Sequence, residues 1–329
     1  MLKTRKFNWG ILGCGHIAGQ FATSISIIPN TSLKAVASRS LERADKFAQK
    51  FNAEKSYDSY EQLACDQEVD AIYIATTHNS HFENTMLCLK NNKAVLCEKP
   101  LTVNANEAKR LIEYAREHKI FLMEAFWSRF LPFTKTLKSL IQDGSIGEVR
   151  LIQADFGFDM PYDPDNRAYN ADLAGGALLD VGVYPLNFAQ MIFGCCPEDI
   201  QSSCTFTETG VDAQSAYIIR YSGGRLAVLN SAINVETRLD AWLYGSEGYI
   251  HLPDFFHAQK IHIHKKNGEA QTILTPYLST GYSYEAEEVM KCIELSKIES
   301  EIMPLDESLE IMQIMDRFRN SWGIKYPFE

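Results

Sequence analysis

Three side chains of this sequence have the chemistry to move a proton at an alcohol. Lys99 comes directly off a short apolar run in VLCEKPLT. Asp180 and Tyr184 lie four residues apart in ALLDVGVYPLNFAQMIF, whose apolar spacing predicts a helix that presents both on one face. An ammonium group beside a phenol lowers the pKa of that phenol. Tyr184 is therefore the candidate general acid or base, with Lys99 as its electrostatic partner and Asp180 as the residue that orients Lys99 or the substrate hydroxyl.

These residues also have plainer interpretations. Asp180 and Tyr184 could be hydrogen-bonded core groups of an apolar helix, and Glu98-Lys99-Pro100 could be a solvated loop. Pro185 removes a helical hydrogen bond, so we expect a bend just beyond Tyr184.

A glycine-rich loop near the N-terminus predicts a dinucleotide site. Gly13-x-Gly15-x-x-Ala18 directly follows an apolar run and opens a helical pattern. The first glycine permits a tight turn, the second lets backbone N–H groups approach a pyrophosphate, and a small third residue lets the helix pack closely. His16 and Ile17 complete the helix start, whose positive end would face the anion. A plain strand–helix turn is the alternative.

The second predicted strand ends where the adenosine ribose of such a nucleotide would lie. An NAD-specific site usually has an acidic residue there. This sequence has Ser38, Arg39 and Ser40, with Arg43 one helical turn further on. Because a guanidinium matches a phosphate geometrically, the pattern predicts NADP as cofactor. Alternatively, both arginines are surface charges and NAD is accepted equally.

The elements that must position these residues alternate over residues 1–124. Strand patterns at 7–13, 32–38, 69–76, 93–98 and 120–124 are separated by helical patterns at 17–28, 40–51, 59–66, 81–92 and 104–118. This alternation predicts an α/β fold with a doubly wound parallel sheet, a Rossmann domain. Ligands bind outside the carboxyl ends of such strands, and Lys99 emerges at one of these ends.

The pattern changes after Glu124. A helix is expected at 131–143, and strands at 148–158, 202–209, 215–222, 225–233, 238–245 and 260–266 are separated by hairpin-like turns. Two helical patterns, at 283–296 and 306–320, close the chain. We therefore predict a second α/β domain over 125–329, with a large, open, mainly antiparallel sheet that serves substrate binding and assembly.

The bulk composition narrows the class of partner. The formal net charge of −10 argues against nucleic acid or an anionic membrane as a partner. We find no signal peptide, no membrane-spanning run and no set of metal ligands. Eight cysteines without CxxC pairs fit reduced thiols in a cytoplasmic protein, and any role of Cys195 and Cys196 stays open.

The sequence resembles the Gfo/Idh/MocA oxidoreductase family over essentially its whole length. The motifs that carry the resemblance are the glycine loop, TTHNSHF, EKP and Asp180-x-x-x-Tyr184. MEAFWSRFLP and AGGALLDVGVYP are similar to the branch of dimeric dihydrodiol dehydrogenases and NADP-dependent D-xylose dehydrogenases. The resemblance implies homodimers or homotetramers formed through the C-terminal sheet.

The resemblance also implies roles for individual residues. It places Thr76 and Thr77 by the adenosine half of the cofactor and His81 near the nicotinamide. Asn79, in the same loop, is a further cofactor candidate, and a helix-start cap is the alternative for it. Lys99 would also hold the nicotinamide ribose, with Glu98 beside it. Trp127 and Arg129 would lie by the nicotinamide and substrate, and Arg167 and Tyr169 are weaker substrate candidates.

Together these features predict an NADP-dependent oxidoreductase, with NAD as a second cofactor that the site would admit. It would transfer hydride between nicotinamide and a secondary alcohol or carbonyl of a small-molecule sugar, polyol or cyclic diol. Two alternatives remain. One is a redox glycosidase that keeps its NAD cofactor bound, and the other is a non-catalytic sugar or NAD(P) sensor of the same fold.

Overall fold

The computed structural model describes residues 5–329 of the 329-residue chain. The chain forms two compact units. The first consists of the residues up to Phe130 together with Leu278–Ser308, and the second of Leu131–Tyr277 together with Leu309–Glu329. Within the described residues, no helix is long and apolar enough to cross a membrane.

The first unit is built on a six-stranded, wholly parallel sheet. Its strand order is β3-β2-β1-β4-β5-β6, so the chain reverses its direction of strand addition between β1 and β4. This order is that of a doubly wound dinucleotide-binding sheet and confirms the predicted fold class. The strands are β1 (Phe7–Leu12), β2 (Thr31–Ala37), β3 (Lys55–Tyr57), β4 (Ala71–Ile74), β5 (Ala94–Glu98) and β6 (Leu122–Ala125).

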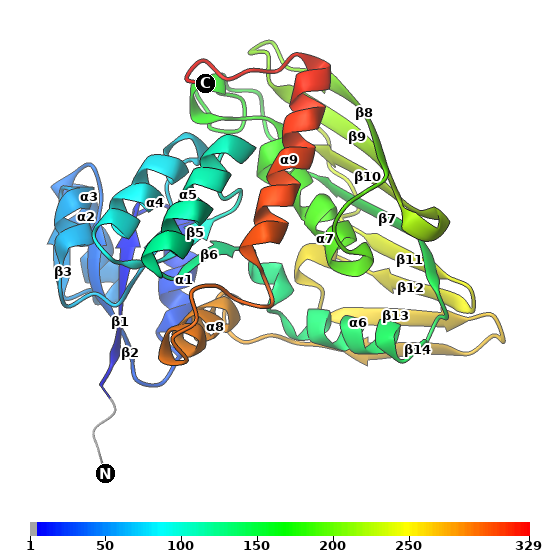
Figure 1. Ribbon diagram of the computed structural model, residues 1–329, viewed down its shortest axis with the longest axis horizontal. Coiled ribbons are helices and arrows are strands. Elements are labelled where there is room, and N and C mark those ends of the chain that lie inside the picture. Colours follow the sequence, from blue (N-terminus) through cyan, green and yellow to red (C-terminus); the bar gives the residue numbers. More distant parts are fainter. Residues whose placement is uncertain (1–4) are drawn as a thin grey trace. The chain divides into compact units, whose positions relative to one another are not determined.

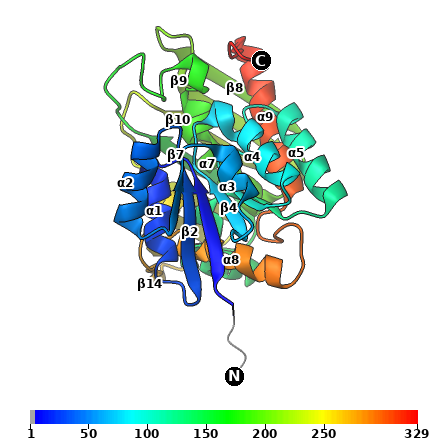
Figure 2. The same ribbon diagram turned by 90° about the vertical axis from the view of Figure 1, so that its left-hand side faces the viewer.

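Helices cover both faces of this sheet, with α1 and α2 on one side and α4 and α5 on the other (Figure 2). Two of these helices begin at side-chain N-caps. Ser40 accepts a hydrogen bond from the Arg43 N–H at the start of α2, and Asn104 accepts one from the Glu107 N–H at the start of α5. The helices are α1 (His16–Ile25), α2 (Leu41–Phe51), α3 (Tyr60–Cys65), α4 (His81–Lys90) and α5 (Ala105–His118).

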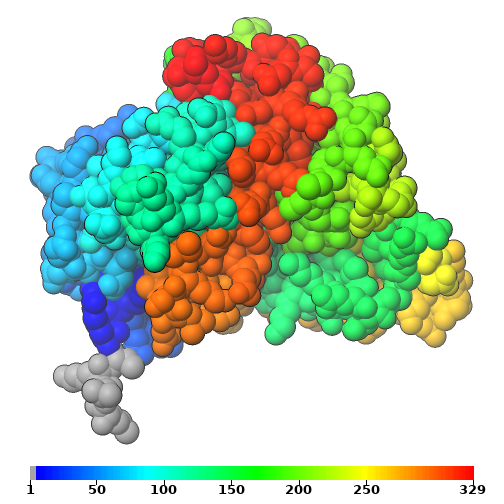
Figure 3. Space-filling view, viewed as in Figure 1, coloured from blue at the N-terminus to red at the C-terminus, as the bar shows by residue number. Residues whose placement is uncertain are grey.

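A segment from the C-terminal half of the chain completes the first unit. It carries α8 (Ser283–Glu294) and lies against residues of the N-terminal half, as the orange surface in Figure 3 shows. The Ser24 and Thr280 hydroxyls lie 2.7 Å apart, and the Leu122 N–H donates to the Ile298 carbonyl at 3.0 Å. The assignment of residues 1–124 to cofactor and 125–329 to substrate and assembly stays a prediction about function.

The second unit is built on an eight-stranded sheet with the order β14-β13-β12-β11-β7-β10-β9-β8. Only the β7–β10 pair is parallel, so the predicted open, mainly antiparallel sheet is confirmed. Along β9 buried and exposed residues alternate, as expected when one face is covered. The strands are β7 (Val149–Gly157), β8 (Asp199–Phe206), β9 (Asp212–Tyr221), β10 (Arg225–Ala232), β11 (Ala241–Gly245), β12 (Gly248–Leu252), β13 (Lys260–Lys265) and β14 (Ala270–Leu274).

The helices α6 (Pro132–Gln142), α7 (Val183–Phe193) and α9 (Leu305–Trp322) lie on one face of this sheet (Figure 1). A π-helix, Leu178–Gly182, leads directly into α7. The predicted bend beyond Tyr184 is therefore misplaced, because the irregular turn precedes Tyr184. Pro185 lies in the first turn of α7, but it lies within a continuous helical stretch, because Gly182 has helical φ and ψ and the π-helix runs directly into α7. Its missing N–H group therefore leaves one hydrogen bond of this stretch unmade.

Candidate active site

The glycine loop has the shape that a pyrophosphate requires. Gly13 has φ +98°, and a Cβ there would lie 2.8 Å from the Ala75 carbonyl oxygen, so only glycine fits without strain. Gly15 is the N-cap of α1, and the nearest atom to a Cβ added there is the same oxygen, at 4.0 Å. The space before the α1 N-terminus is thus open, and an anion placed there would meet backbone N–H groups.

A hollow between α1 and α2 begins at this loop and is bordered by cations. The guanidinium of Arg43 and the ammonium groups of Lys46 and Lys50 come from successive turns of α2, and Lys46 also pairs with Glu42 at 2.6 Å. These lysines were not predicted from the sequence, although their spacing from Arg43 gives one basic stripe. The hollow is lined by Cys14, Gly15, His16, Gly19, Gln20, Thr23, Arg43, Lys46, Phe47, Lys50 and Phe51.

The end of β2 brings the two predicted arginines to one phenol. Ser38 is buried and its N–H donates to the Tyr57 carbonyl at 3.1 Å, while Arg39 is exposed. Burial raises the pKa of Tyr60, and both Arg39 and Arg43 act to lower it, so the three side chains lie near one another. Tyr60 is a candidate cofactor contact that no sequence motif indicated.

Nothing in this loop activates Cys14 as a nucleophile, because its environment disfavours the thiolate. Burial raises the pKa of its thiol to about 11, which the nearby Arg43 only partly opposes. The residue is therefore a small filler between the loop and β2, and its thiol lies 3.5 Å from the Ala37 carbonyl.

The loop after β4 is braced by its own side chains. The Thr77 hydroxyl donates to Asn79 at 2.7 Å, and Thr76 accepts from the Asn84 amide at 3.1 Å. His81 is fully buried, with its ring nitrogens 2.7 Å from the Pro100 carbonyl and 3.1 Å from the Thr76 carbonyl. Burial lowers the pKa of His81 to about 4, so a neutral ring joins the β4 and β5 loops. The predicted place of His81 by the nicotinamide stays a prediction.

The two charged residues of the Glu98-Lys99-Pro100 motif differ in burial. Glu98 is buried, accepts a hydrogen bond from the Tyr73 hydroxyl and accepts the Lys99 backbone N–H at 3.2 Å. Burial raises the pKa of Glu98 to about 6, and the Lys99 charge opposes this. Lys99 is half-buried, and its peptide bond to Pro100 is cis. Glu98 therefore fixes the backbone from which Lys99 projects.

A second carboxyl lies near this motif. Glu285 of α8 is fully buried, and neither of its oxygens has a hydrogen-bond partner among residues 5–329. Burial and the nearby Glu98 hold the pKa of Glu285 well above its usual range. A neutral Glu285 adds no second negative charge beside Glu98.

Trp127 and Arg129 are both held within the first unit. The Trp127 ring stacks on Tyr282 with centroids 4.7 Å apart and planes within 6°. Arg129 is buried, pairs with Glu307 and donates to the Ile302 carbonyl at 3.2 Å. Arg129 thus has a structural partner, and its predicted place beside nicotinamide and substrate stays a prediction.

In the second unit the π-helix carries Asp180. This carboxylate is 3% exposed and accepts from the half-exposed Arg167 guanidinium at 2.9 Å. Its own N–H donates to the Gly176 carbonyl at 3.3 Å. The loop that carries Arg167 therefore contacts the π-helix through Asp180, while the role of Arg167 in substrate binding stays a prediction.

Tyr184 lies in the first turn of α7 beside an aromatic wall. Its ring centroid lies 5.2 Å from that of Phe156 and 5.7 Å from that of Phe256, and Tyr184 is 8% exposed. Phe156 and Phe256 in turn stack at 4.4 Å. This wall, formed by β7 and the turn Phe255–His257, was not predicted, because its residues are far apart in the sequence.

The predicted catalytic residues are divided between the units, with Lys99 in the first and Asp180 and Tyr184 in the second. Their joint action stays a prediction.

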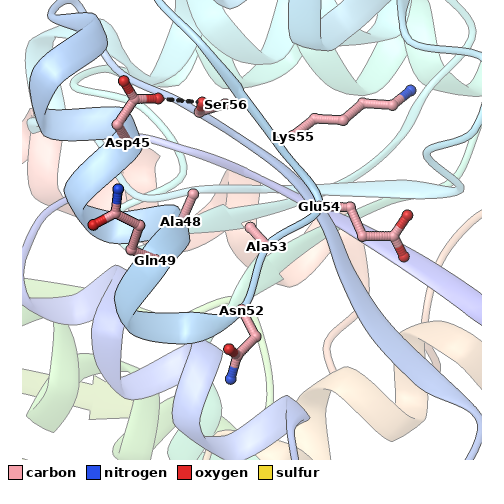
Figure 4. Close-up of a pocket in the computed structure, with 8 residues that line it drawn as sticks. All are labelled: Asp45, Ala48, Gln49, Asn52, Ala53, Glu54, Lys55 and Ser56. Carbon is pink, nitrogen blue, oxygen red and sulfur yellow. Dashed lines mark hydrogen bonds between the residues drawn. The ribbon is translucent and has the colours of Figure 1, made fainter.

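A second hollow lies at the C-terminal end of α2 and, unlike the first, is not lined by residues of the glycine loop (Figure 4). There Ser56 donates to Asp45, and Lys55 turns away to pair with Asp66 at 3.0 Å. Among residues 5–329 no group of three His, Cys, Asp or Glu side chains could hold a metal ion.

Comparison with known proteins agrees with these two units. Residues 7–126 match a family model described as an oxidoreductase family with an NAD-binding Rossmann fold, and residues 134–251 match the GFO/IDH/MocA C-terminal domain. The trans-1,2-dihydrobenzene-1,2-diol dehydrogenase of Xenopus tropicalis is 39% identical, over 97% of this chain and 99% of that protein. The human protein of the same name is 36% identical, over 97% of this chain and 98% of its own.

Solved structures give a similar result. KijD10, a 3-ketoreductase from Actinomadura kijaniata in complex with NADP and TDP-benzene, has a TM-score of 0.86 at 25% identity, over 96% of this chain and 98% of that chain. The aldose-aldose oxidoreductase from Caulobacter crescentus has a TM-score of 0.88 at 22% identity, over 97% of this chain and 98% of that chain, which shows a shared fold.

Proposed function

This chain belongs to the Gfo/Idh/MocA oxidoreductase family, and from that premise we propose that it oxidises trans-cyclic diols with NADP⁺ or reduces the corresponding ketones with NADPH. The observation that carries the proposal is the 39% identity to a dihydrodiol dehydrogenase over 97% of the chain. Sugars form the second candidate substrate class, as the family resemblance of the sequence implies. KijD10, a 3-ketoreductase solved with NADP and TDP-benzene, agrees with an alcohol–carbonyl reaction.

The residues of the first unit suit NADP. The open space at Gly15 would admit the pyrophosphate, and the stripe of cations on α2 would attract phosphate groups. Arg39 and Arg43 would bind the 2′-phosphate, because a guanidinium offers several donors in one plane. The bound cofactor supplies the hydride acceptor or donor.

The residues of the second unit suit proton transfer. The Tyr184 phenolate oxygen would take the proton from a substrate alcohol and become a neutral phenol. An unperturbed phenol, with a pKa of about 10, is rarely ionised at neutral pH. We assign the stabilisation of its phenolate to Lys99, since about 1.4 kcal/mol of such stabilisation lowers the pKa of a phenol by one. Asp180, fixed by Arg167, would accept a hydrogen bond from the substrate hydroxyl and orient it.

The wall beside Tyr184 favours a cyclic substrate with an apolar face. The half-buried Phe256 ring, stacked on the buried Phe156, lies next to the phenol, and an aromatic ring of this kind binds flat hydrocarbon faces well. The C–H face of a sugar ring would also pack there. The wall therefore fits both substrate classes, and a comparison of kcat/KM for diols and for sugars distinguishes between them.

The test is an initial-rate assay of nicotinamide absorbance with trans-1,2-dihydrobenzene-1,2-diol, D-xylose and D-glucose. We expect NADP⁺ reduction with the diol at the highest kcat/KM. The matched variant Tyr184→Phe should lose about 10²-fold or more in kcat, because general-base catalysis is worth that much, while its affinity for NADPH stays the same. Sugar cleavage without net cofactor reduction would indicate the redox glycosidase instead, and binding without turnover would indicate a sensor.

We further propose a cytoplasmic homo-oligomer assembled through the eight-stranded sheet. All eight cysteines are free thiols, as expected in a reducing compartment. Half-buried rings cover part of the sheet, with Trp242 stacked on His251 at 3.9 Å and Tyr249 on His264 at 4.7 Å. Light scattering should give the mass of a dimer or tetramer, and a monomer at micromolar concentration would contradict the proposal.

A further inference from the structure

The start of the catalytic π-helix is held by a buried carboxylate from a neighbouring strand. Asp212, the first residue of β9, is 1% exposed. Its Oδ2 accepts the backbone N–H of Leu178 at 2.7 Å and the Ser215 hydroxyl at 2.6 Å. Leu178 is the first residue of the π-helix, where backbone N–H groups have no partner within the helix. Asp212 therefore caps this helix from outside.

The two glycines before the helix allow this approach. Gly176 has φ +112°, and a Cβ there would lie 2.3 Å from Asp212 Oδ1. A Cβ on Gly175 would lie 2.7 Å from the Ala168 carbonyl oxygen, and the Gly175 carbonyl accepts the Tyr326 hydroxyl at 2.7 Å. The Gly-Gly pair is thus needed to bring the carboxylate to the helix start.

The far end of the π-helix is fixed by the same part of the sheet. The hydroxyls of Tyr217 on β9 and Ser231 on β10 are hydrogen-bonded at 2.6 Å. A Cβ on Gly182 would lie 2.6 Å from the first and 2.8 Å from the second. The five-residue π-helix is therefore clamped at both ends, and Asp180 lies between the clamps. Such π-turns often occur at functional sites, where they redirect a side chain.

We propose that Asp212 is a positioning residue for the reaction, which through the Leu178 N–H sets the places of Asp180 and Tyr184, two and six residues further on. This inference rests on the function proposed above. Asp212 acts through the helix backbone, so its effect should appear in turnover and in the order of the helix rather than in the binding of NADP(H).

The charged state of Asp212 fits this role. Burial raises the pKa of Asp212 to about 6, while the bonds from Ser215 and Leu178 and the charge of Arg319 oppose the rise. The phenols of Tyr217 and Tyr326 and the thiol of Cys204 lie near this carboxylate. Burial and the charge of Asp212 raise the pKa of each of the three groups, so all three are neutral. The carboxylate is therefore the negative end of this cluster at pH 7 and accepts both hydrogen bonds.

The test compares three variants of the full-length protein. Asp212→Ala removes the cap, Asp212→Asn keeps an acceptor oxygen for Leu178, and Ser215→Ala is a matched control that removes only the other hydrogen bond. We expect kcat to fall about 10²-fold in the alanine variant at position 212, because a small misplacement of catalytic groups costs that much. KM for NADP⁺ should be unchanged, and the asparagine variant and the Ser215 variant should retain most of kcat.

Hydrogen exchange of the amides in 178–184 gives a readout that does not require activity. Exchange should accelerate in Asp212→Ala and remain near the wild-type rate in Asp212→Asn and Ser215→Ala. Wild-type kcat or unchanged exchange in Asp212→Ala would overturn the inference. If Asp212→Ala does not fold, the test rests on Asp212→Asn. A large loss of kcat, or accelerated exchange of the 178–184 amides, in Asp212→Asn would then overturn the inference. If wild-type protein reduces no cofactor with any substrate, the proposed function fails, and the exchange rates alone decide the positioning role.

Discussion

The buried carboxyl of Glu285 makes a quantitative prediction about stability. The folded protein keeps this group protonated, because it is fully buried near Glu98 and has no hydrogen-bond partner among residues 5–329. In the unfolded chain the same group ionises with a pKa near 4.3. Above that pH the folded state thus binds one proton more than the unfolded state.

The sign and the size of the effect follow from this difference. Because the folded state binds the extra proton, its free energy of unfolding falls by about 1.4 kcal/mol for each pH unit above 5 on account of this one group. Glutamine has nearly the same shape and does not ionise. The stability of Glu285→Gln relative to wild type should therefore increase from pH 5 to pH 7, by at most about 1.4 kcal/mol for each pH unit.

Urea denaturation at pH 5, 6 and 7, followed by tryptophan fluorescence, measures this difference. Glu287→Gln is the matched control, because Glu287 is exposed on the same helix, and its stability relative to wild type should not change with pH. If Glu285→Gln shows the same stability difference at all three pH values, or a difference that shrinks as the pH rises, the assignment of a neutral buried Glu285 is refuted.

Three further predictions concern the cofactor and the base. Gly13→Ala should be less stable than wild type by about 1–2 kcal/mol, because alanine is strained at positive φ, and its melting temperature in differential scanning fluorimetry should fall. Gly15→Ala should melt like wild type but bind NADPH more weakly. Arg39→Asp should raise KM for NADP⁺ about tenfold or more and leave KM for NAD⁺ nearly unchanged, since a charged hydrogen bond to the 2′-phosphate is worth about 1.5–3 kcal/mol. Lys99→Met should move the pH profile of kcat for alcohol oxidation to higher pH; an unshifted profile would contradict the role of Lys99.

The sequence predicted those parts of the site that depend on local rules. The tight turn at Gly13 and the exit of Lys99 from a strand follow from parallel-sheet geometry, because that geometry fixes where strand ends and helix starts meet. The prediction of one parallel and one mainly antiparallel sheet was confirmed, because the order of strand and helix patterns along the chain distinguishes the two kinds of sheet. The strands β3, β12 and β14 were missed, because they lack the continuous buried apolar run that marks the equally short strands β4, β5 and β6.

What the sequence did not predict depends on contacts between distant residues. The apolar spacing of ALLDVGVYP fits a helix but does not distinguish an α-turn from the π-turn observed at Leu178–Gly182. The cap from Asp212 joins residues 34 positions apart. The burial of Glu285 follows from the packing of α8 on the first unit, which the chain order did not indicate.

The most direct test of the account follows the hydrogen that is transferred. The trans-cyclic diol is deuterated at its carbinol carbons and incubated with the protein and NADP⁺. The account predicts that absorbance of reduced cofactor rises, that deuterium is recovered on the nicotinamide ring of NADPH, and that the rate falls in Tyr184→Phe. If NADP⁺ is not reduced, or if it is reduced without deuterium on the ring, direct hydride transfer from the diol carbon is contradicted.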